Sequence, residues 1–199
     1  MEEIVFVTHN KGKVASANRD CKNIKFKVFD YEVDEPRSES LQEIAKSKVE
    51  QAYKLIKKPC IAMDSGFFIE ALNGFPKTFV NFSLETIGIE GILNLMKEKE
   101  NRKCSFKECL AYYDGKEIKY FYGETKGELS KEILGQDRAK SWSDLWYIFK
   151  PQNFDKTMAQ MSDEERELRV KKDGSTSAFK VFADWYENNK INKKLKRMP

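Results

Sequence analysis

Residues 60–66 read CIAMDSG, four apolar residues followed at once by an acid, a serine and a glycine. So short an apolar run predicts a buried β-strand over Cys60–Met63 that stops at a polar turn over Asp64–Gly66. Residues 4–7 (IVFV) predict a second buried strand, which runs directly into the polar loop Thr8–Lys13. Ligands of α/β proteins bind outside the carboxyl ends of strands, so these two segments are where we expect a site.

Helical periodicity alternates with these strands, which makes the fold class α/β. Ser40 and Glu43 are spaced as a capping box in front of an apolar stripe that runs to Ile56. The other expected elements are helices at about 13–21, 86–97, 162–171 and 177–188, a strand at about 25–31, and a hairpin over 109–122 around the turn Asp114–Gly115.

Length and composition indicate a folded α/β domain, of one or two lobes. The chain has 199 residues, 40% of them hydrophobic, which suffices for a core and excludes a disordered chain. No run approaches the roughly 20 apolar residues of a membrane-spanning helix, and the start of the chain lacks the basic region of a signal peptide. We therefore predict a cytoplasmic domain over residues 1–188 and a basic tail over residues 189–199.

The tail has two interpretations. Four lysines and one arginine fall within residues 190–197, and such a run attracts RNA or DNA. A solvated chain end is the ordinary explanation, and we favour it.

The cysteines and the single histidine argue against several kinds of site. Cys21, Cys60, Cys104 and Cys109 have no metal-binding spacing, which predicts buried free thiols in a reducing compartment. With His9 as the one histidine, we expect neither a His-based zinc site nor a Ser-His-Asp triad, and our default for His9 is a solvent-facing role.

The loop Thr8–Lys13 has the residue types of an anion site. Asn10 at the start of a helix leaves backbone N–H groups free, and Lys11 and Lys13 add positive charge. Thr8 contributes a hydroxyl. The pattern alone is weak, because many loops contain Asn, Gly and Lys.

Three charged residues outside this loop have a structural and a functional interpretation. Asp64 and Glu35 are suited to share a magnesium ion, but they also fit a turn cap and a surface charge. Lys48 falls inside the apolar stripe of its helix, so it either snorkels to solvent or reaches an anionic group.

Six segments together resemble one known family. They are TxNxxK (8–13), Glu35, SLQEIAxxK (40–48), DSGFFIEALNGFP (64–76), ETIGxEGIL (85–93) and KTxAQMSxEE (156–165). In this order they strongly resemble the inosine triphosphate pyrophosphatase (Ham1-like) family, particularly its archaeal-type members. The resemblance spans nearly the whole chain, and the segment 64–76 is its most specific part.

The resemblance implies a fold and a chemistry. The family has an elongated, bent mixed sheet flanked by helices, with a cleft between two lobes, and it usually forms homodimers. It hydrolyses deaminated purine triphosphates such as ITP, dITP and XTP to the monophosphate and pyrophosphate with Mg²⁺. By position, Thr8, Asn10, Lys13, Ser65 and Gly66 resemble phosphate binders, Lys48 the helix lysine that faces the phosphates, and Glu35 and Asp64 the metal carboxylates. Asp64 also resembles the activator of the attacking water.

The departures from the family pattern are heaviest in the base-recognition half. Ser16 stands where the first motif has a glutamate. Ser143–Phe149 replaces a Phe-Gly-Trp/Tyr-Asp-Pro run, which leaves Trp142 and Trp146 as candidate stacking rings unless they lie in the core. Val170–Lys172 replaces Ser-His-Arg, so Trp146, Lys171 and Lys172 are the candidate substitutes for the usual base readers. Losing hydrogen-bonding groups relaxes or redirects base choice and leaves phosphate chemistry intact.

Four hypotheses follow from this pattern. The first is a pyrophosphatase with ITP-like preference, and the second is a pyrophosphatase directed at another modified or a standard nucleotide. The third is a nucleotide-binding protein without turnover, suggested by Ser16, and the fourth is nucleic-acid binding through the tail. We favour the first.

Overall fold

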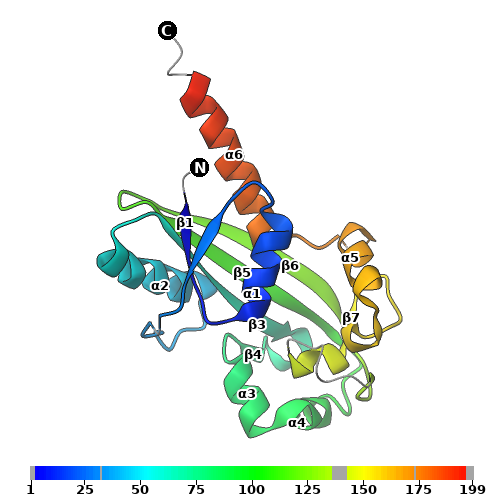
Figure 1. Cartoon of the computed structure of the whole chain (residues 1–199). Coiled ribbons are helices and arrows are strands. Elements are labelled where there is room, and N and C mark those ends of the chain that lie inside the picture. The colour runs from blue at the N-terminus through cyan, green and yellow to red at the C-terminus, as the bar shows by residue number, and fades with distance from the viewer. Residues whose placement is uncertain (1–2, 32, 136–142, 173, 196–199) are drawn as a thin grey trace. The chain divides into compact units, whose positions relative to one another are not determined.

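The computed structural model describes residues 3–31, 33–135, 143–172 and 174–195 (Figure 1). The chain forms two compact units, each assembled from separate segments. Unit 1 comprises Met1–Asp64, Glu108–Gly123 and Ser177–Pro199, and unit 2 comprises Ser65–Lys107 and Glu124–Thr176.

Seven strands form one mixed sheet, in the order β2-β1-β3-β5-β6-β7, with β4 paired to β3. β1 is parallel to both β2 and β3, whereas β4 is antiparallel to β3 and β7 is antiparallel to β6. The strands are β1 (Ile4–Val7), β2 (Phe26–Phe29), β3 (Cys60–Ile69), β4 (Pro76–Lys77), β5 (Lys103–Tyr113), β6 (Ile118–Leu129) and β7 (Phe149–Pro151). The predicted mixed α/β sheet is confirmed.

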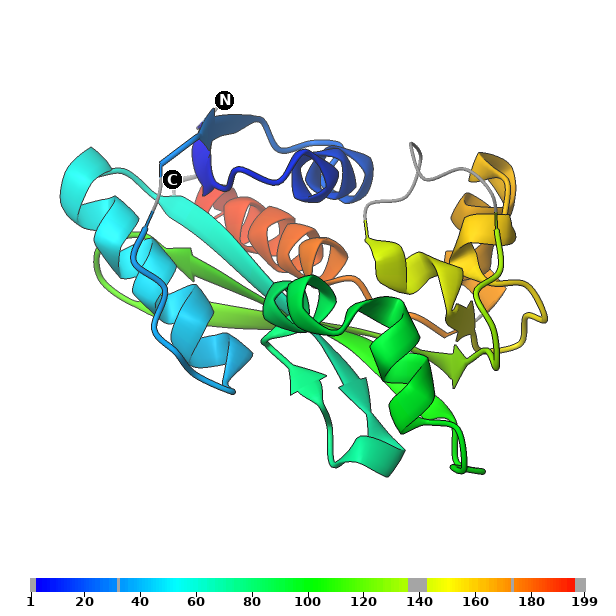
Figure 2. The ribbon, with the colours of Figure 1, turned by 90° about the horizontal axis from the view of Figure 1, so that it is seen from below.

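In unit 1, helices cover both faces of the strands (Figure 2). Helices α1 (Lys11–Asp20) and α6 (Ala178–Leu195) pack on one face, around a core that includes Phe6, Met63 and Phe182. Helix α2 (Leu41–Ile56) packs on the other face. Because side chains alternate along a strand, neighbouring residues of β3 and β5 point to opposite helical layers.

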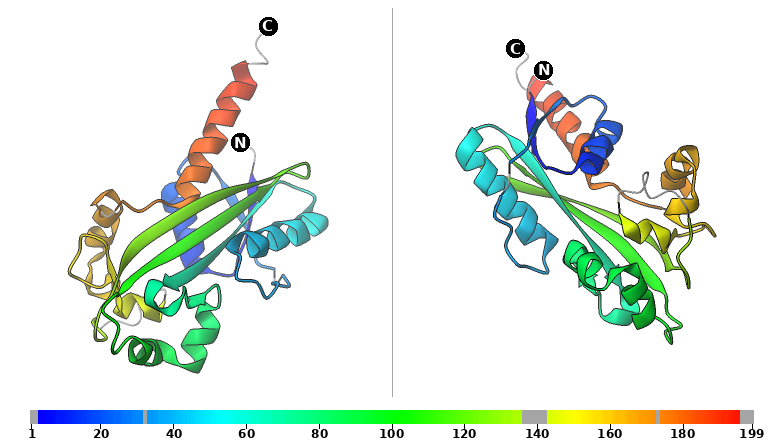
Figure 3. Two further views of the ribbon diagram at one scale, coloured as in Figure 1. Left: turned by 180° about the vertical axis from the view of Figure 1, so that it is seen from behind. Right: turned by 60° about the horizontal axis from the view of Figure 1, so that its bottom comes forward.

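In unit 2, one hydrophobic core joins the ends of β3, β6 and β7 to α4. α3 packs against both α4 and β4 (Figure 3). The helices are α3 (Val80–Thr86), α4 (Gly88–Leu95) and α5 (Asp163–Lys172), with 3-10 turns η1 (Glu70–Leu72), η3 (Asp144–Tyr147) and η4 (Met158–Gln160).

The expected turn over Asp64–Gly66 is wrong, because β3 continues to Ile69 without interruption. Glycine is needed at position 66 because β4 lies very close to β3 there, and not because the chain turns. A Cβ at this position would lie 2.5 Å from the backbone oxygen of Lys77 on β4. The polar triplet resembles a turn in sequence, yet the apolar residues after it, such as Phe67 and Ile69, are fully buried and extend the strand.

Two further expectations need correction. The helix expected over 86–97 starts later, as α4, because Gly88 has a φ of +65° and separates it from α3, a helix that the sequence analysis did not predict. The capping box of α2 is only half formed. Ser40 Oγ accepts from the Glu43 N–H, but the Ser40 N–H donates to Ser38 Oγ instead of to Glu43.

Other expectations are confirmed. A turn at Asp114 joins β5 to β6, and all four cysteines are buried free thiols. Within the described residues, no helix is both long and apolar enough to cross a membrane. Helix α6 passes through the expected boundary at residue 188 and ends at Leu195, so the separate tail stays a prediction, and residues 196–199 lie outside the described residues.

Candidate active site

The loop after β1 is ordered by its own polar side chains. Asn10 is the N-cap of α1, and its side-chain oxygen accepts from the Lys13 N–H at 3.1 Å. Thr8 Oγ1 accepts from the Asn10 N–H at 3.1 Å. The predicted helix start is confirmed, and the capped N-terminus points the dipole of α1 at this loop.

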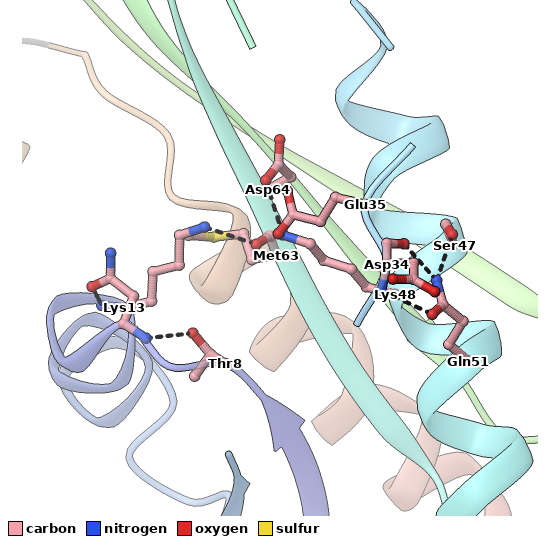
Figure 4. A network of polar contacts seen from close by, with 10 residues as sticks. Thr8, Lys13, Asp34, Glu35, Ser47, Lys48, Gln51, Met63 and Asp64 are labelled. Atoms are coloured by element: carbon pink, nitrogen blue, oxygen red, sulfur yellow. Dashed lines mark hydrogen bonds and ion pairs between the residues drawn. The ribbon is translucent and has the colours of Figure 1, made fainter. Parts of the chain in front are cut away.

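Lys13 extends from the first turn of α1 towards β3. Its Nζ donates to the Met63 carbonyl at 2.9 Å (Figure 4). Burial lowers the pKa of Lys13, and the nearby carboxylate of Asp64 opposes that shift. A lysine held by one neutral acceptor keeps donors free for an anion.

Lys48 joins the two predicted metal carboxylates. Its Nζ lies 2.7 Å from Glu35 Oε1 and 3.2 Å from Asp64 Oδ1 (Figure 4). Lys48 and Asp64 are each only 8% exposed, whereas most of the Glu35 side chain is exposed. Of the two interpretations of Lys48, the structure supports the second: its side chain reaches anionic groups and does not snorkel to solvent.

The acidic loop that carries Glu35 is fastened to α2. Gln51 Nε2 donates to the Asp34 carbonyl at 2.7 Å, and Gln51 Oε1 accepts from the Asp34 N–H at 3.0 Å. Ser47 Oγ accepts a further bond from Gln51 Nε2 at 2.9 Å. Sequence reasoning missed Gln51, although its position three residues after Lys48, on the same helical face, is a usable signal.

The arrangement fits a magnesium ion delivered with a nucleotide. Two carboxylates contact one ammonium, so one of their two negative charges is left for a cation that arrives with a ligand. Among the described residues, no group of three or more His, Cys, Asp or Glu side chains could hold a metal. Magnesium commonly takes one or two carboxylates and completes its shell with phosphate oxygens and water. Glu35 and Asp64 are the residues that would hold it.

The remaining predicted phosphate binders follow Asp64 along β3. Ser65 is half-buried, and Gly66 is buried beneath the backbone of Lys77. Both residues lie inside β3, so their backbone N–H groups point to opposite edges of the strand. They therefore do not form the shared anion-binding turn that the sequence suggested. Their role in phosphate binding stays a prediction.

The candidate base readers lie in unit 2. Trp146 is half-buried against the core of that unit, and the guanidinium of Arg166 lies over its ring at 5.4 Å from the centroid. Lys172 is exposed at the end of α5, where its carbonyl accepts from Asn153 Nδ2. The side chain of Lys171 and the whole of Trp142 lie outside the described residues. The roles of Trp146, Lys171 and Lys172 stay predictions.

Two residues of the first motif stand apart from this network. His9 is exposed and pairs with Asp30 at the end of β2. Ser16 is half-buried on α1, one turn after Lys13, and supplies no charge.

A capped helix start beside a strand end, with two lysines and two carboxylates, defines an α/β protein equipped for a phosphorylated ligand and a divalent ion. Comparison with known proteins narrows this class. The model of the Ham1 family matches residues 4–182. The chain belongs to the Ham1 family.

Individual relatives agree. The chain is 34% identical to the dITP/XTP pyrophosphatase of Thermococcus kodakarensis, over 94% of this chain and 98% of the relative. It is 35% identical to the dITP/XTP pyrophosphatase of Methanopyrus kandleri, over 94% and 97%. The solved structure of the Staphylococcus aureus Ham1 protein superposes with a TM-score of 0.76 at 28% identity, covering 94% of this chain and all of that one.

Proposed function

We propose that this protein is a magnesium-dependent nucleoside triphosphate pyrophosphatase. It hydrolyses deaminated purine nucleotides of the ITP, dITP and XTP kind to the monophosphate and pyrophosphate. The observation that carries the proposal is the contact of the Lys48 ammonium with both Glu35 and Asp64, on the sheet face that α2 covers. The names of the relatives, dITP/XTP pyrophosphatases at 34% and 35% identity, support this substrate class.

The phosphates are held by the cations and N–H groups of unit 1. Lys13 exchanges the Met63 carbonyl, a neutral acceptor, for a charged phosphate oxygen, which forms a stronger hydrogen bond. The N-terminus of α1, with Thr8 and Asn10, binds a second part of the triphosphate. Phosphoryl chemistry asks mainly for such positioning and for charge stabilisation, and it needs no covalent nucleophile from the protein.

Asp64 and Lys48 act on the attacking water. Lys48 donates to Asp64 Oδ1 at 3.2 Å, which holds the orientation of the carboxylate. An ionised Asp64 accepts the proton of the water and fixes its approach to the α phosphorus. A magnesium ion supplies charge neutralisation and a more acidic water when it is bound. An ammonium has three donors, so Lys48 also donates to a phosphate oxygen while it holds Asp64.

A pyrophosphate-release assay with Mg²⁺ against ITP, XTP, dITP and the standard NTPs and dNTPs tests the proposal. We expect release from at least one nucleotide and a loss of about 10³-fold or more in Asp64→Asn, because the amide cannot accept the proton. Normal nucleotide binding without release across the panel would contradict the proposal and favour a binding protein.

Base preference is the part of the proposal with an alternative. Arg166 over the ring of Trp146 occupies a face on which a base would stack, which favours an active pyrophosphatase of shifted specificity. Fastest release from ATP or from a pyrimidine nucleotide in the same panel would establish that alternative.

The proposal also covers the cellular location and the oligomeric state of the enzyme. We place it in the cytoplasm as a homodimer, as the family resemblance implies. Light scattering of the purified protein at several concentrations tests the dimer.

A further inference from the structure

The loop Thr8–Lys13 carries a histidine that the proposed chemistry does not use. The Nδ1 atom of His9 contacts Asp30 Oδ1, in the segment that follows β2. Both side chains are more than half exposed. An exposed ion pair contributes little to the free energy of unfolding, so stability alone is a weak account of this contact.

The contact spans the point at which β1 and β2 separate. The two strands are paired in parallel up to Val7 and Phe29, and the N–H of Thr8 adds a bond to the Phe29 carbonyl at 3.3 Å. After this point the first segment enters α1, and the second leads to the acidic loop that carries Glu35. The imidazole and the carboxylate thus join the start of one loop to the start of the other.

The other polar side chains of the phosphate-binding loop act within it. Thr8 Oγ1 accepts from the Asn10 N–H, and Asn10 Oδ1 accepts from the Lys13 N–H, each at 3.1 Å. These bonds fix the shape of the loop and of the first turn of α1. The contact of His9 with Asp30 leaves the loop and therefore bears on its position relative to the neighbouring segment.

The acidic loop is held at two places. Gln51 of α2 bonds the backbone of Asp34, next to Glu35. Asp30 lies four residues before Asp34 and is held by His9. Under the proposed function, Glu35 and the phosphates share one magnesium ion, so affinity depends on the spacing between the two loops. Displacements of about 1 Å are enough to weaken such a site.

We propose that His9 is a positioning residue, which sets the spacing between the phosphate-binding loop and the acidic loop through its contact with Asp30. The inference rests on the proposed function, because that function assigns the two loops to the phosphates and to magnesium. The imidazole itself does not touch the nucleotide. The contact requires a proton on Nδ1, which the imidazolium and one tautomer of the neutral ring both carry.

His9→Ala tests the inference, with magnesium tripolyphosphate as the probe in calorimetry. We expect Kd to rise about two- to fivefold, the size of one exposed pair. KM for the best nucleotide should rise by the same factor, with kcat within about twofold. His9→Asn places an amide N–H at the position of Nδ1 and should bind the probe as the unmodified protein does. An equal loss in His9→Asn would overturn the inference, because the ring would then act directly.

A double-mutant cycle with Asp30→Ala decides whether the effect passes through the pair. Asp30→Ala also removes a negative charge near the phosphates, which by itself favours binding of an anion, so the coupling is the informative quantity. The factor by which Asp30→Ala changes Kd should be about two- to fivefold less favourable with His9 present than in the His9→Ala background. Equal factors in the two backgrounds would overturn the inference.

Glu117→Ala is the matched control for these variants. Glu117 is an exposed carboxylate of unit 1 that pairs with Lys119 at 3.0 Å, and its removal should leave probe binding unchanged. Thermal denaturation separates positioning from a merely structural role, since loss of an exposed pair should lower Tm by less than about 4 °C. A larger loss of stability in His9→Ala with an unchanged Kd would overturn the inference.

The two proposals fail in different ways. If the unmodified protein binds magnesium tripolyphosphate but hydrolyses no nucleotide, the proposed function fails and the cycle still tests His9. If it hydrolyses nucleotide and His9→Ala matches it in both Kd and KM, only the inference fails.

Discussion

Lys48 is the residue on which the site's charge balance depends. Lys48→Ala leaves Asp64 buried without its cation, so we expect pyrophosphate release to fall about 10²- to 10³-fold. The measurement is the initial rate at saturating nucleotide and Mg²⁺.

Lys46→Ala is the matched control on the same helix. Lys46 is half exposed and pairs with Glu50 at 3.8 Å, a contact of small energy. Equal losses of rate in the two variants would show that α2 tolerates neither change and that Lys48 has no special role.

At the residue scale, the sequence predicted the members of the site better than their partners. Lys48 was recognisable as a charge inside an apolar stripe, and motif order pointed to Glu35 and Asp64. The Met63 carbonyl, which accepts from Lys13, was missed, because its position depends on β3 lying beside β1. Partners from distant segments depend on strand order, which periodicity does not encode.

Among the elements, the link between α2 and the acidic loop has a testable role. Gln51→Ala removes both bonds to the Asp34 backbone, so Glu35 loses part of its support. We expect the Mg²⁺ concentration for half-maximal activity to rise about three- to tenfold, as for a lost support of a metal ligand, with little change in thermal stability. A magnesium titration at fixed nucleotide measures it.

Lys54→Ala is the comparison for this change. Lys54 is exposed in the last turn of the same helix and should leave the titration unchanged. A magnesium requirement that stays constant in Gln51→Ala would remove the acidic loop from the metal site.

Element boundaries show where sequence reasoning failed. The amphipathic helix α2 was predicted almost to the residue, because its cap and its stripe are both local signals. β3 was cut short at Asp64, since a polar triplet with glycine imitates a turn. The close approach of the Lys77 backbone requires Gly66, and that requirement comes from a strand elsewhere in the chain.

For the whole molecule, the buried thiols report how the two units unfold. Cys21, Cys60 and Cys109 lie in unit 1 and Cys104 lies in unit 2. Burial raises the pKa of Cys60 to about 12, so the folded protein presents almost no thiolate at neutral pH. Because β3, β5 and β6 each contribute residues to both units, we expect one cooperative transition.

Thiol labelling during denaturant titration, read by mass spectrometry, checks this expectation. The four cysteines should become reactive together, with one midpoint. Labelling of Cys104 at a clearly lower denaturant concentration than Cys60 would show that unit 2 opens separately.

The contact of Lys48 with Glu35 and Asp64 also bears on when the enzyme is competent. One lysine offsets half of the charge of this pair of acids, so the pair attracts a divalent ion from solution less strongly than two unpaired carboxylates would. Under the proposed function, each catalytic cycle therefore begins when a nucleotide arrives with its own magnesium. Hydrolytic capacity is thus coupled to the presence of the compound to be destroyed.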